Sequence, residues 1–147
     1  MRSFRQSFIV LSLILLLAVQ GLAHGTGSDH THPENEDGIE TAKVWLEFVD
    51  SQRYTASWQT AAPVFKAAVT KDQWEKTIKT VRDPLGALLE RRLFHDRFTS
   101  TLPGMPDGEY LVLRFVTAFQ HKQSAVETVS LMKDDHDTWR VAGYFIK

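Results

Sequence analysis

The spacing of apolar residues changes once along this chain, and that change constrains the fold more than any other feature. From Ile39 to Val81, apolar residues recur every three or four positions, as on one face of a helix. Beyond the corner Pro84-Leu85-Gly86 they tend to alternate, as in strands with one buried face. Helices followed by consecutive strands predict an α+β domain, in which helices cover one face of an antiparallel meander sheet.

The helical half is predicted to contain several pieces. The first helix begins near Asp37, which with Glu40 resembles a capping box, and it ends near Asp50. Pro63 suits the first turn of another piece, because its missing N–H is not needed there. The last helix begins after a second capping box and has an apolar inner stripe; the residues concerned are Thr70, Gln73, Trp74, Ile78 and Val81.

Four strands are expected after the corner, and their predicted ranges are 88–99, 110–121, 124–133 and 138–146. The connection 102–109 contains two Pro and two Gly, which predicts a wide turn. The short segment DDHD at 134–137 predicts a tight one. The expected fold is therefore a set of N-terminal helices packed on a curved four-stranded antiparallel meander sheet.

The chain opens with the layout of a secretory signal peptide. Arg2 and Arg5 precede an apolar run over 8–19, and Gly21-Leu22-Ala23 suits signal peptidase. The run is shorter than the about 20 residues that span a bilayer, so we predict cleavage after Ala23 and a periplasmic or secreted protein with no stable membrane span. An uncleaved anchor is the alternative. The predicted divisions are a signal peptide (1–23), a flexible polar lead-in (24–37) and one α+β domain (38–147).

Cysteine content and charge narrow the compartment and the partners. The chain has no cysteine, so an exported domain of this size folds without disulfides, which suits a bacterial periplasm. Loss of Arg2 and Arg5 with the signal peptide reduces the 17 basic residues to 15, against 18 acidic ones, a net charge of −3. Nucleic acid is therefore not an expected partner, because no basic excess neutralises phosphates. No motif for a cofactor is present, and none is expected.

The lead-in contains three histidines, His24, His30 and His32. Imidazoles suit Cu, Ni or Zn, and His24 would add its free amine after cleavage. The spacing lacks the rigid framework of a closed metal site. A metal-binding segment and a soluble tether therefore remain as alternatives.

One carboxylate interrupts the apolar row of a predicted strand. In SAVETVSLM (124–132), Glu127 shares a face with Ala125, Val129 and Leu131. If the two flanking turns are centred on 122 and 135, this face points toward the helices, and Glu127 lies between Thr117 and Gly143. An isolated carboxylate there would cost several kcal/mol, so it must be paired, protonated or open to a cavity.

Three settings for Glu127 follow. It pairs with Arg91, or with Thr117 and a buried water, and holds the sheet together; it faces a pocket; or it lies at an edge exposed to water. In the pocket it would bind a ligand together with Thr117, Arg91, Phe115 and Trp139, or act as a general base. The first strand has two registers, and the sequence does not choose between them: one places Arg91 opposite Thr117, and the other places Arg92 there and turns Phe94 and Phe98 inward.

The opposite face of the predicted sheet is unusually apolar for a surface exposed to water. Val112, Val116 and Val126 lie on it, with Arg114 and Arg140 beside Ser130. An antiparallel sheet can leave one face in water, but this composition also suits packing against a second copy. A homodimer through the outer face and a single domain with scattered surface apolar residues are the two alternatives.

Several stretches of the sequence resemble one protein family. They are FVDSQRYTASWQTAAPVFKAAVTKDQW (48–74), VRDPLGALLERR (81–92), LPGMPDGEY (102–110), ETVSLM (127–132) and WRVAGYFIK (139–147). Together they are similar to a bacterial exported family known as domain of unknown function 4019. The order of elements also resembles nuclear-transport-factor-2-like and cystatin-like cones, in which helices cap a curved sheet. The family implies no catalytic or binding residues, and likeness of layout is weak warrant for function.

The expected function is that of an exported small domain that binds a small ligand or acts as a protein-interaction scaffold, and it is not expected to be an enzyme. One alternative is a cone-shaped isomerase or hydrolase with Glu127 as general base, since burial in an apolar cavity raises the pKa of a carboxyl group. The other is a metal-binding envelope protein that uses His24, His30 and His32.

Overall fold

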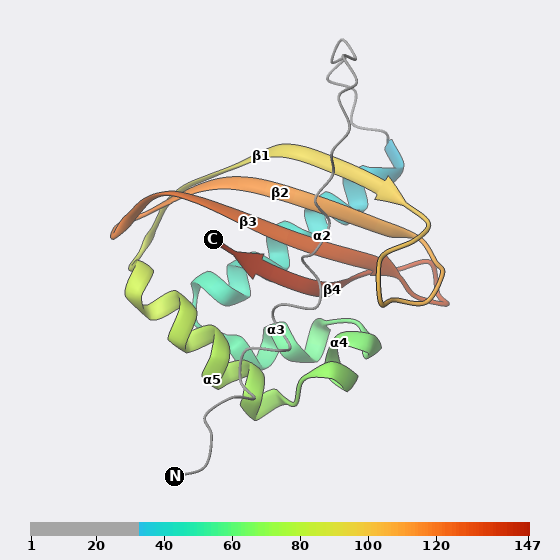
Figure 1. The fold of residues 1–147 in the computed structure, drawn as a ribbon, viewed down its shortest axis with the longest axis horizontal. Coiled ribbons are helices and arrows are strands. Elements are labelled where there is room, and N and C mark those ends of the chain that lie inside the picture. The colour runs from blue at the N-terminus through green and yellow to red at the C-terminus, as the bar shows by residue number, and fades with distance from the viewer. Residues whose placement is uncertain (1–32) are drawn as a thin grey trace.

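The computed structural model describes residues 33–147 (Figure 1). The predicted signal peptide and the three candidate metal ligands His24, His30 and His32 lie outside these residues. The elements follow the order α2 (Pro33–Asp50), α3 (Tyr54–Thr60), α4 (Pro63–Ala68), α5 (Lys71–Arg82), the 3₁₀ turn η1 (Asp83–Leu85), β1 (Leu88–Thr99), β2 (Tyr110–Phe119), β3 (Lys122–Lys133) and β4 (Trp139–Ile146).

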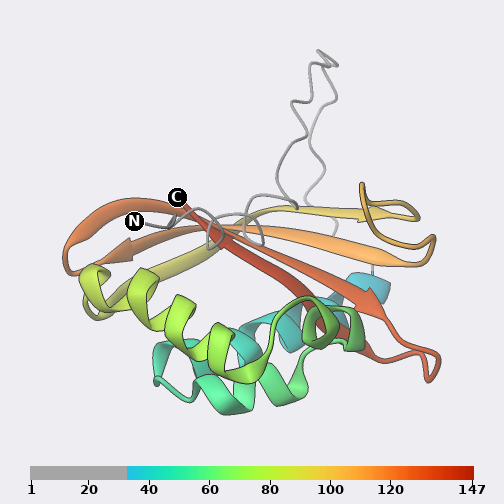
Figure 2. The same ribbon diagram turned by 60° about the horizontal axis from the view of Figure 1, so that its bottom comes forward.

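The strands form one antiparallel sheet in the order β1-β2-β3-β4, which confirms the predicted α+β class and the meander. Figure 2 shows α2 to α5 on a single side of this sheet, so one face packs on them and no helix of residues 33–147 covers the other. The two faces therefore have different roles, and the register of each strand decides which side chains each face carries.

Helix α2 begins at Pro33, a turn earlier than the predicted start at Asp37. Proline is tolerated in the first helical turn because the N–H it lacks has no partner there. Asn35 is buried, and its side-chain amide donates to Asp96 of β1 at 3.0 Å. Residues 33–37, expected to belong to the flexible lead-in, are thus helical and in contact with the sheet.

The core between the layers contains an aromatic cluster held by one serine. Trp45 and Trp74 have ring centroids 5.8 Å apart, and both contact the ring of Tyr144. The indole N–H of Trp74 donates to the Ser57 hydroxyl at 2.9 Å, and that of Trp45 donates to the Ser57 carbonyl at 2.8 Å. Ser57 therefore satisfies two buried indole donors, which explains a fully buried polar residue in a short helix.

The β2–β3 pairing differs from the predicted register by two residues. Phe115, not Thr117, is opposite Glu127, and Thr117 is opposite Ala125. The hairpin closes through the pair Phe119 and Lys122, so its turn lies earlier than a turn centred on residue 122. Because the offset is even, Phe115, Thr117 and Glu127 still face the helices, and all three are buried.

A bulge in β4 changes which residues face inward. Ser130 pairs with Gly143, whereas the next residue, Leu131, pairs with Val141, so Ala142 has no partner on β3. The alternation reverses beyond this point. Tyr144, predicted on the outer face, is buried among the helices, and Phe145, predicted inward, shares the outer face with Thr128. The register before the bulge is also wrong by two residues, since Leu131 pairs with Val141 and not with Trp139, so Ile146 and not Gly143 lies opposite Glu127.

Strand β1 begins in the register that places Arg91 opposite Thr117, and of the two phenylalanines that the other register turns inward only Phe98 faces the helices, while Phe94 is 45% exposed. Arg91 is opposite Thr117, but a second irregularity at Phe94 shifts the pairing, so that Asp96 and Phe98 then face inward opposite Leu113 and Leu111. Phe98 meets the Trp139 ring edge-on at 6.5 Å. Because of this irregularity, both Arg91 and Phe98 point to the helical side, which neither regular register would allow.

Candidate functional site

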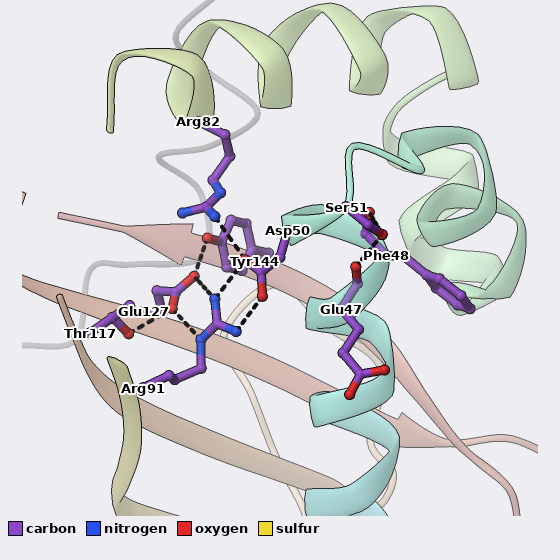
Figure 3. Close-up of polar contacts among 9 residues, drawn as sticks. All are labelled: Glu47, Phe48, Asp50, Ser51, Arg82, Arg91, Thr117, Glu127 and Tyr144. Atoms are coloured by element: carbon purple, nitrogen blue, oxygen red, sulfur yellow. Dashed lines mark hydrogen bonds and ion pairs between the residues drawn. The ribbon is translucent and has the colours of Figure 1, made fainter. Parts of the chain in front are cut away.

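Glu127 sits at the centre of a network of buried polar side chains (Figure 3). It is 0% exposed, and each of its oxygens accepts two hydrogen bonds. Oε2 accepts from Arg91 Nε and from Thr117 Oγ1, both at 2.6 Å. Oε1 accepts from Tyr144 Oη at 2.6 Å and from Arg91 Nη2 at 3.2 Å. A carboxylate has about four acceptor sites, so no site is left for a ligand.

Asp50, the last residue of α2, extends the network to the helices (Figure 3). Arg91 donates to both of its oxygens, with Nη1–Oδ2 at 2.6 Å and Nη2–Oδ1 at 3.0 Å. Arg82, the last residue of α5, donates from Nη2 to Asp50 Oδ1 at 2.7 Å. A carboxylate at a helix C-terminus opposes the helix dipole, and the two guanidinium groups offset that cost. The network is neutral, with two carboxylates and two guanidinium groups.

Arg82 is the most weakly satisfied member of this network. Its side chain is 6% exposed, and its Nε and Nη1 have no hydrogen-bond partner within residues 33–147. Its guanidinium carbon lies 4.1 Å from the centroid of the Phe119 ring, so a cation–π contact stabilises the charge from the other side.

The environment of Glu127 shifts its titration in a definite direction. Burial acts to raise the pKa of this carboxyl, but the hydrogen bonds and charge of Arg91, with the hydroxyls of Thr117 and Tyr144, outweigh it and leave the pKa below its usual value. Burial and the adjacent Glu127 carboxylate raise the pKa of Tyr144 well above its usual value. Burial acts to lower the pKa of Arg91, yet its bonds to Asp50 and Glu127 raise it overall. Glu127 and Arg91 are therefore charged at neutral pH, and Tyr144 is not.

This arrangement suits a structural role better than proton transfer. A general base works best with a pKa near the operating pH and with a free oxygen pointing at its substrate. Glu127 has a lowered pKa and no free oxygen. Its network joins one residue from each of the four strands with two helix ends: Arg91, Thr117, Glu127, Tyr144, Asp50 and Arg82.

The structure brings together only part of the predicted ligand site. Glu127, Thr117 and Arg91 are bonded to one another, and Phe115 is a core residue opposite Glu127. Trp139 lies elsewhere: it pairs with Lys133 and packs against Phe98. The predicted set therefore divides into a polar network and separate core residues.

Three network members were not predicted: Asp50, Arg82 and Tyr144. Tyr144 was missed because the bulge at Ala142 reverses the alternation of β4. The sequence gives only a weak indication of Asp50 and Arg82. Each is a charged residue at the end of a helix, and such residues are commonly exposed at the surface. The contact between Asp50 and Arg91 joins residues 41 positions apart, which local periodicity does not encode.

A second notable feature is the cationic character of the open sheet face. Arg92 and Arg114 lie on it by strand alternation, and the Phe94 bulge adds His95, opposite Arg114, and Arg97. All four side chains are exposed, and none forms an ion pair with any residue of 33–147. The strands contain three acidic residues, Glu90, Asp96 and Glu127, and the last two face the helices.

A family model described as "Protein of unknown function (DUF4019)" matches residues 41–144. The chain belongs to the DUF4019 family. The matched range contains every member of the buried network, from Asp50 to Tyr144. Neither a curated protein nor a solved structure matches this DUF4019 chain, so the likeness to nuclear-transport-factor-2-like cones stays a prediction.

Two features of the part of the DUF4019 chain that the structure describes concern membranes and metals. No helix there is long and apolar enough to cross a membrane. Within the same residues, no group of three or more His, Cys, Asp or Glu side chains is placed to hold a metal ion. The metal prediction rests on His24, His30 and His32 and is untouched by this second observation.

Proposed function

We propose that this protein is an exported, non-catalytic scaffold whose open sheet face docks onto an acidic surface of a partner protein. The signal-like layout of residues 1–23 supports export, and the saturated carboxylate of Glu127, which has no free oxygen for the predicted general base, supports a non-catalytic role. The single observation that carries the docking role is the set of unpaired arginines on β1 and β2, Arg92, Arg97 and Arg114, with His95 beside Arg114.

These cations are not explained by stability. Arg92, Arg97 and Arg114 are exposed and form no ion pair with any residue of 33–147, so no charge pairing inside the fold accounts for them. A surface that keeps such charges unpaired is suited to a partner that supplies carboxylates, which arginine binds with two parallel hydrogen bonds.

Apolar side chains lie among the cations. Phe94 is 45% exposed and Val116 is 38% exposed, and Val112, Val126 and Phe145 are half-buried on the same face. Arginine and aromatic residues are enriched at protein interfaces, where lysine is depleted, and this patch contains arginine and no lysine. The composition therefore favours a protein partner over a phospholipid surface.

Strand addition to the edge of β1 is disfavoured. The strand has irregularities at Leu89 and Phe94, and bulges and charges on an edge strand block pairing with a further strand. Docking would use the face of the sheet. Dimerisation through this face, the other predicted use, would place the cations of one copy against a face whose only acidic strand residue is Glu90, so a second copy is a poor match.

The test compares two charge-reversal variants. Arg92→Glu with Arg114→Glu reverses the patch, and Lys76→Glu with Lys79→Glu makes the same change in charge on exposed positions of α5. The probe is poly-glutamate, and NMR shift mapping reports where it binds. We expect shifts at His95, Arg114 and Val116 that fall with added salt and vanish in the arginine variant but not in the lysine variant.

Three results would overturn the proposal. The first is shifts that map away from β1 and β2. The second is binding to phosphatidylglycerol vesicles with no binding to the acidic polypeptide, which would indicate a membrane surface. The third is a dimer in sedimentation that the Arg92→Glu/Arg114→Glu variant converts to a monomer, which would assign this face to self-association.

A further inference from the structure

A groove runs along α2 on the helical side of the domain, and it does not involve the open sheet face. Its volume is about 500 Å³, and its lining is mostly apolar. The lining comes from α2, from Thr60 at the end of α3 and from Val141 of β4. Sites for small organic ligands commonly have volumes in this range and a mainly apolar lining with a few polar groups.

The α2 side of the groove has a gradient of polarity. Its residues recur at helical spacing along one face of the helix: Asp37, Glu40, Thr41, Val44, Trp45 and Phe48. From Asp37 to Phe48 the helix rises about 16 Å at 1.5 Å per residue. Both carboxylates lie toward the N-terminal end, and the two aromatic rings lie toward the C-terminal end. A ligand lying along α2 therefore meets negative charge at one end and apolar surface at the other.

The apolar part of the groove is open to a ligand. Val44 is 43% exposed, so its side chain contributes little to the core. Trp45 is only 2% exposed, and its N–H is bonded to the Ser57 carbonyl, so it forms the floor of the groove and offers no polar group there. The guanidinium of Arg53 lies 4.7 Å from the centroid of the Phe48 ring and supports that ring at the end of the groove.

The acidic end keeps its negative potential. Asp37 forms no ion pair with any residue from 33 to 147, and Glu40 contacts Lys43 at 3.5 Å in a pair whose side chains are both exposed. Exposed pairs of this kind are weak and leave the carboxylate available. The positive end of the α2 dipole would favour an anion here, but two full negative charges outweigh a partial positive charge of about one half.

We propose that this groove binds an amphipathic organic cation. The apolar body of the ligand lies against Val44 and Phe48, above the buried Trp45, and its positive group lies between the carboxylates of Asp37 and Glu40. The charge of the groove and its apolar length select this class against anions and against compact polar ions, because only an amphipathic cation matches both ends at once.

Calorimetric titration of the purified protein, with the residues before Pro33 retained, tests the class of ligand. The two probes are dodecylammonium and dodecanoate, which share a chain length and differ in the sign of the charge, each kept below its micelle-forming concentration. Two partly exposed carboxylates predict a preference for dodecylammonium of about tenfold. Binding of neither probe, or equal binding of both, overturns the proposal.

Matched variants test the location. Asp37→Asn with Glu40→Gln should abolish the preference and keep the affinity for dodecanoate or raise it. Glu47→Gln, an exposed position of α2 that does not line the groove, should retain the preference. A loss of preference in Glu47→Gln equal to that in the double variant would place the effect in the overall charge of the protein and refute the site. The double variant Arg92→Glu/Arg114→Glu should bind dodecylammonium with the affinity of the unmodified protein. The proposal for the groove and the proposal for the sheet face can therefore each be refuted without the other.

Discussion

Replacement of Glu127 by Gln tests the central structural claim, that this carboxylate holds the helices and the sheet together. The change keeps the size of the side chain and removes its charge. It leaves Arg91, 12% exposed in its side chain, with Asp50 as its remaining anion, and the network changes from neutral to a net charge of +1. The amide also presents N–H groups where Oε1 now accepts from Tyr144 and Arg91.

These contacts set the loss of unfolding free energy that we expect for Glu127→Gln. Breaking a buried ion pair by removing one partner costs about 3–5 kcal/mol, because the other charge stays buried without compensation. The Tyr144 hydroxyl can rotate to accept from the new amide and recover part of this loss, so about 3–4 kcal/mol is expected. Small domains have a free energy of unfolding of about 5–15 kcal/mol, so the variant should be marginal but folded.

The assay is urea unfolding followed by tryptophan fluorescence. At a denaturant slope of about 1.5–2 kcal/mol/M, the expected loss lowers the midpoint by about 2 M. Glu90→Gln is the matched control, since Glu90 is exposed on the outer side of β1 and should change stability by no more than about 0.5 kcal/mol. A double-mutant cycle with Arg91→Gln should give a coupling energy of about 1–3 kcal/mol.

Two results would refute the reasoning. If Glu127→Gln unfolds at the same urea concentration as Glu90→Gln, the carboxylate does not hold the fold. If the cycle with Arg91→Gln gives additive losses, the two side chains act independently, and their hydrogen bonds do not contribute the energy assigned to them here.

Three further predictions follow from the same contacts. Because the folded-state pKa of Glu127 is lowered, its contribution to stability is complete above the ordinary value of 4.5 and is lost as the pH falls from there through the lowered pKa; acid titration of Glu127→Gln should lack this component. Tyr144→Phe removes one donor to a buried carboxylate and should cost about 1.5–3 kcal/mol in urea unfolding, with unchanged stability arguing against the bond. Ser57→Ala leaves the buried Trp74 N–H without an acceptor and should cost about 1–3 kcal/mol, whereas Ser51→Ala, at an exposed hydroxyl, should cost far less.

Much of the fold could be predicted from local patterns. The helical spacing, the Thr70–Gln73 capping box and the corner at Pro84 correctly placed the last helix and its end. The bounds of β1 and the turn at 134–137 agree with the structure as well. These features depend on residues within about four positions of one another, where periodicity and turn chemistry are informative.

The candidate site was predictable only in part. The inward direction of Glu127 and its pairing with Arg91 were among the stated alternatives, since an even offset in register leaves a residue on the same face. Thr117 is a partner of Glu127 despite the wrong register, because a diagonal neighbour on the adjacent strand is still within reach.

Tyr144 marks the limit of this reasoning. Strict alternation in β4 turns it outward, and only the bulge at Ala142 brings its hydroxyl to Glu127. A bulge depends on how two strands twist against the helices beneath them, and no neighbouring residue in the sequence reports it.

The amino-acid sequence by itself determined the order of helices and strands, the side of the sheet that packs on the helices, and the presence of a carboxylate among apolar residues. Tertiary structure alone decided which predicted setting of that carboxylate holds, and it added three members of the network: the helix ends Asp50 and Arg82, and Tyr144 of β4. The physical reason is the separation of the interacting residues along the chain. Periodicity records which face a residue occupies within its own element, whereas the network and the unpaired cations of the open face arise from residues that meet only after the elements have packed.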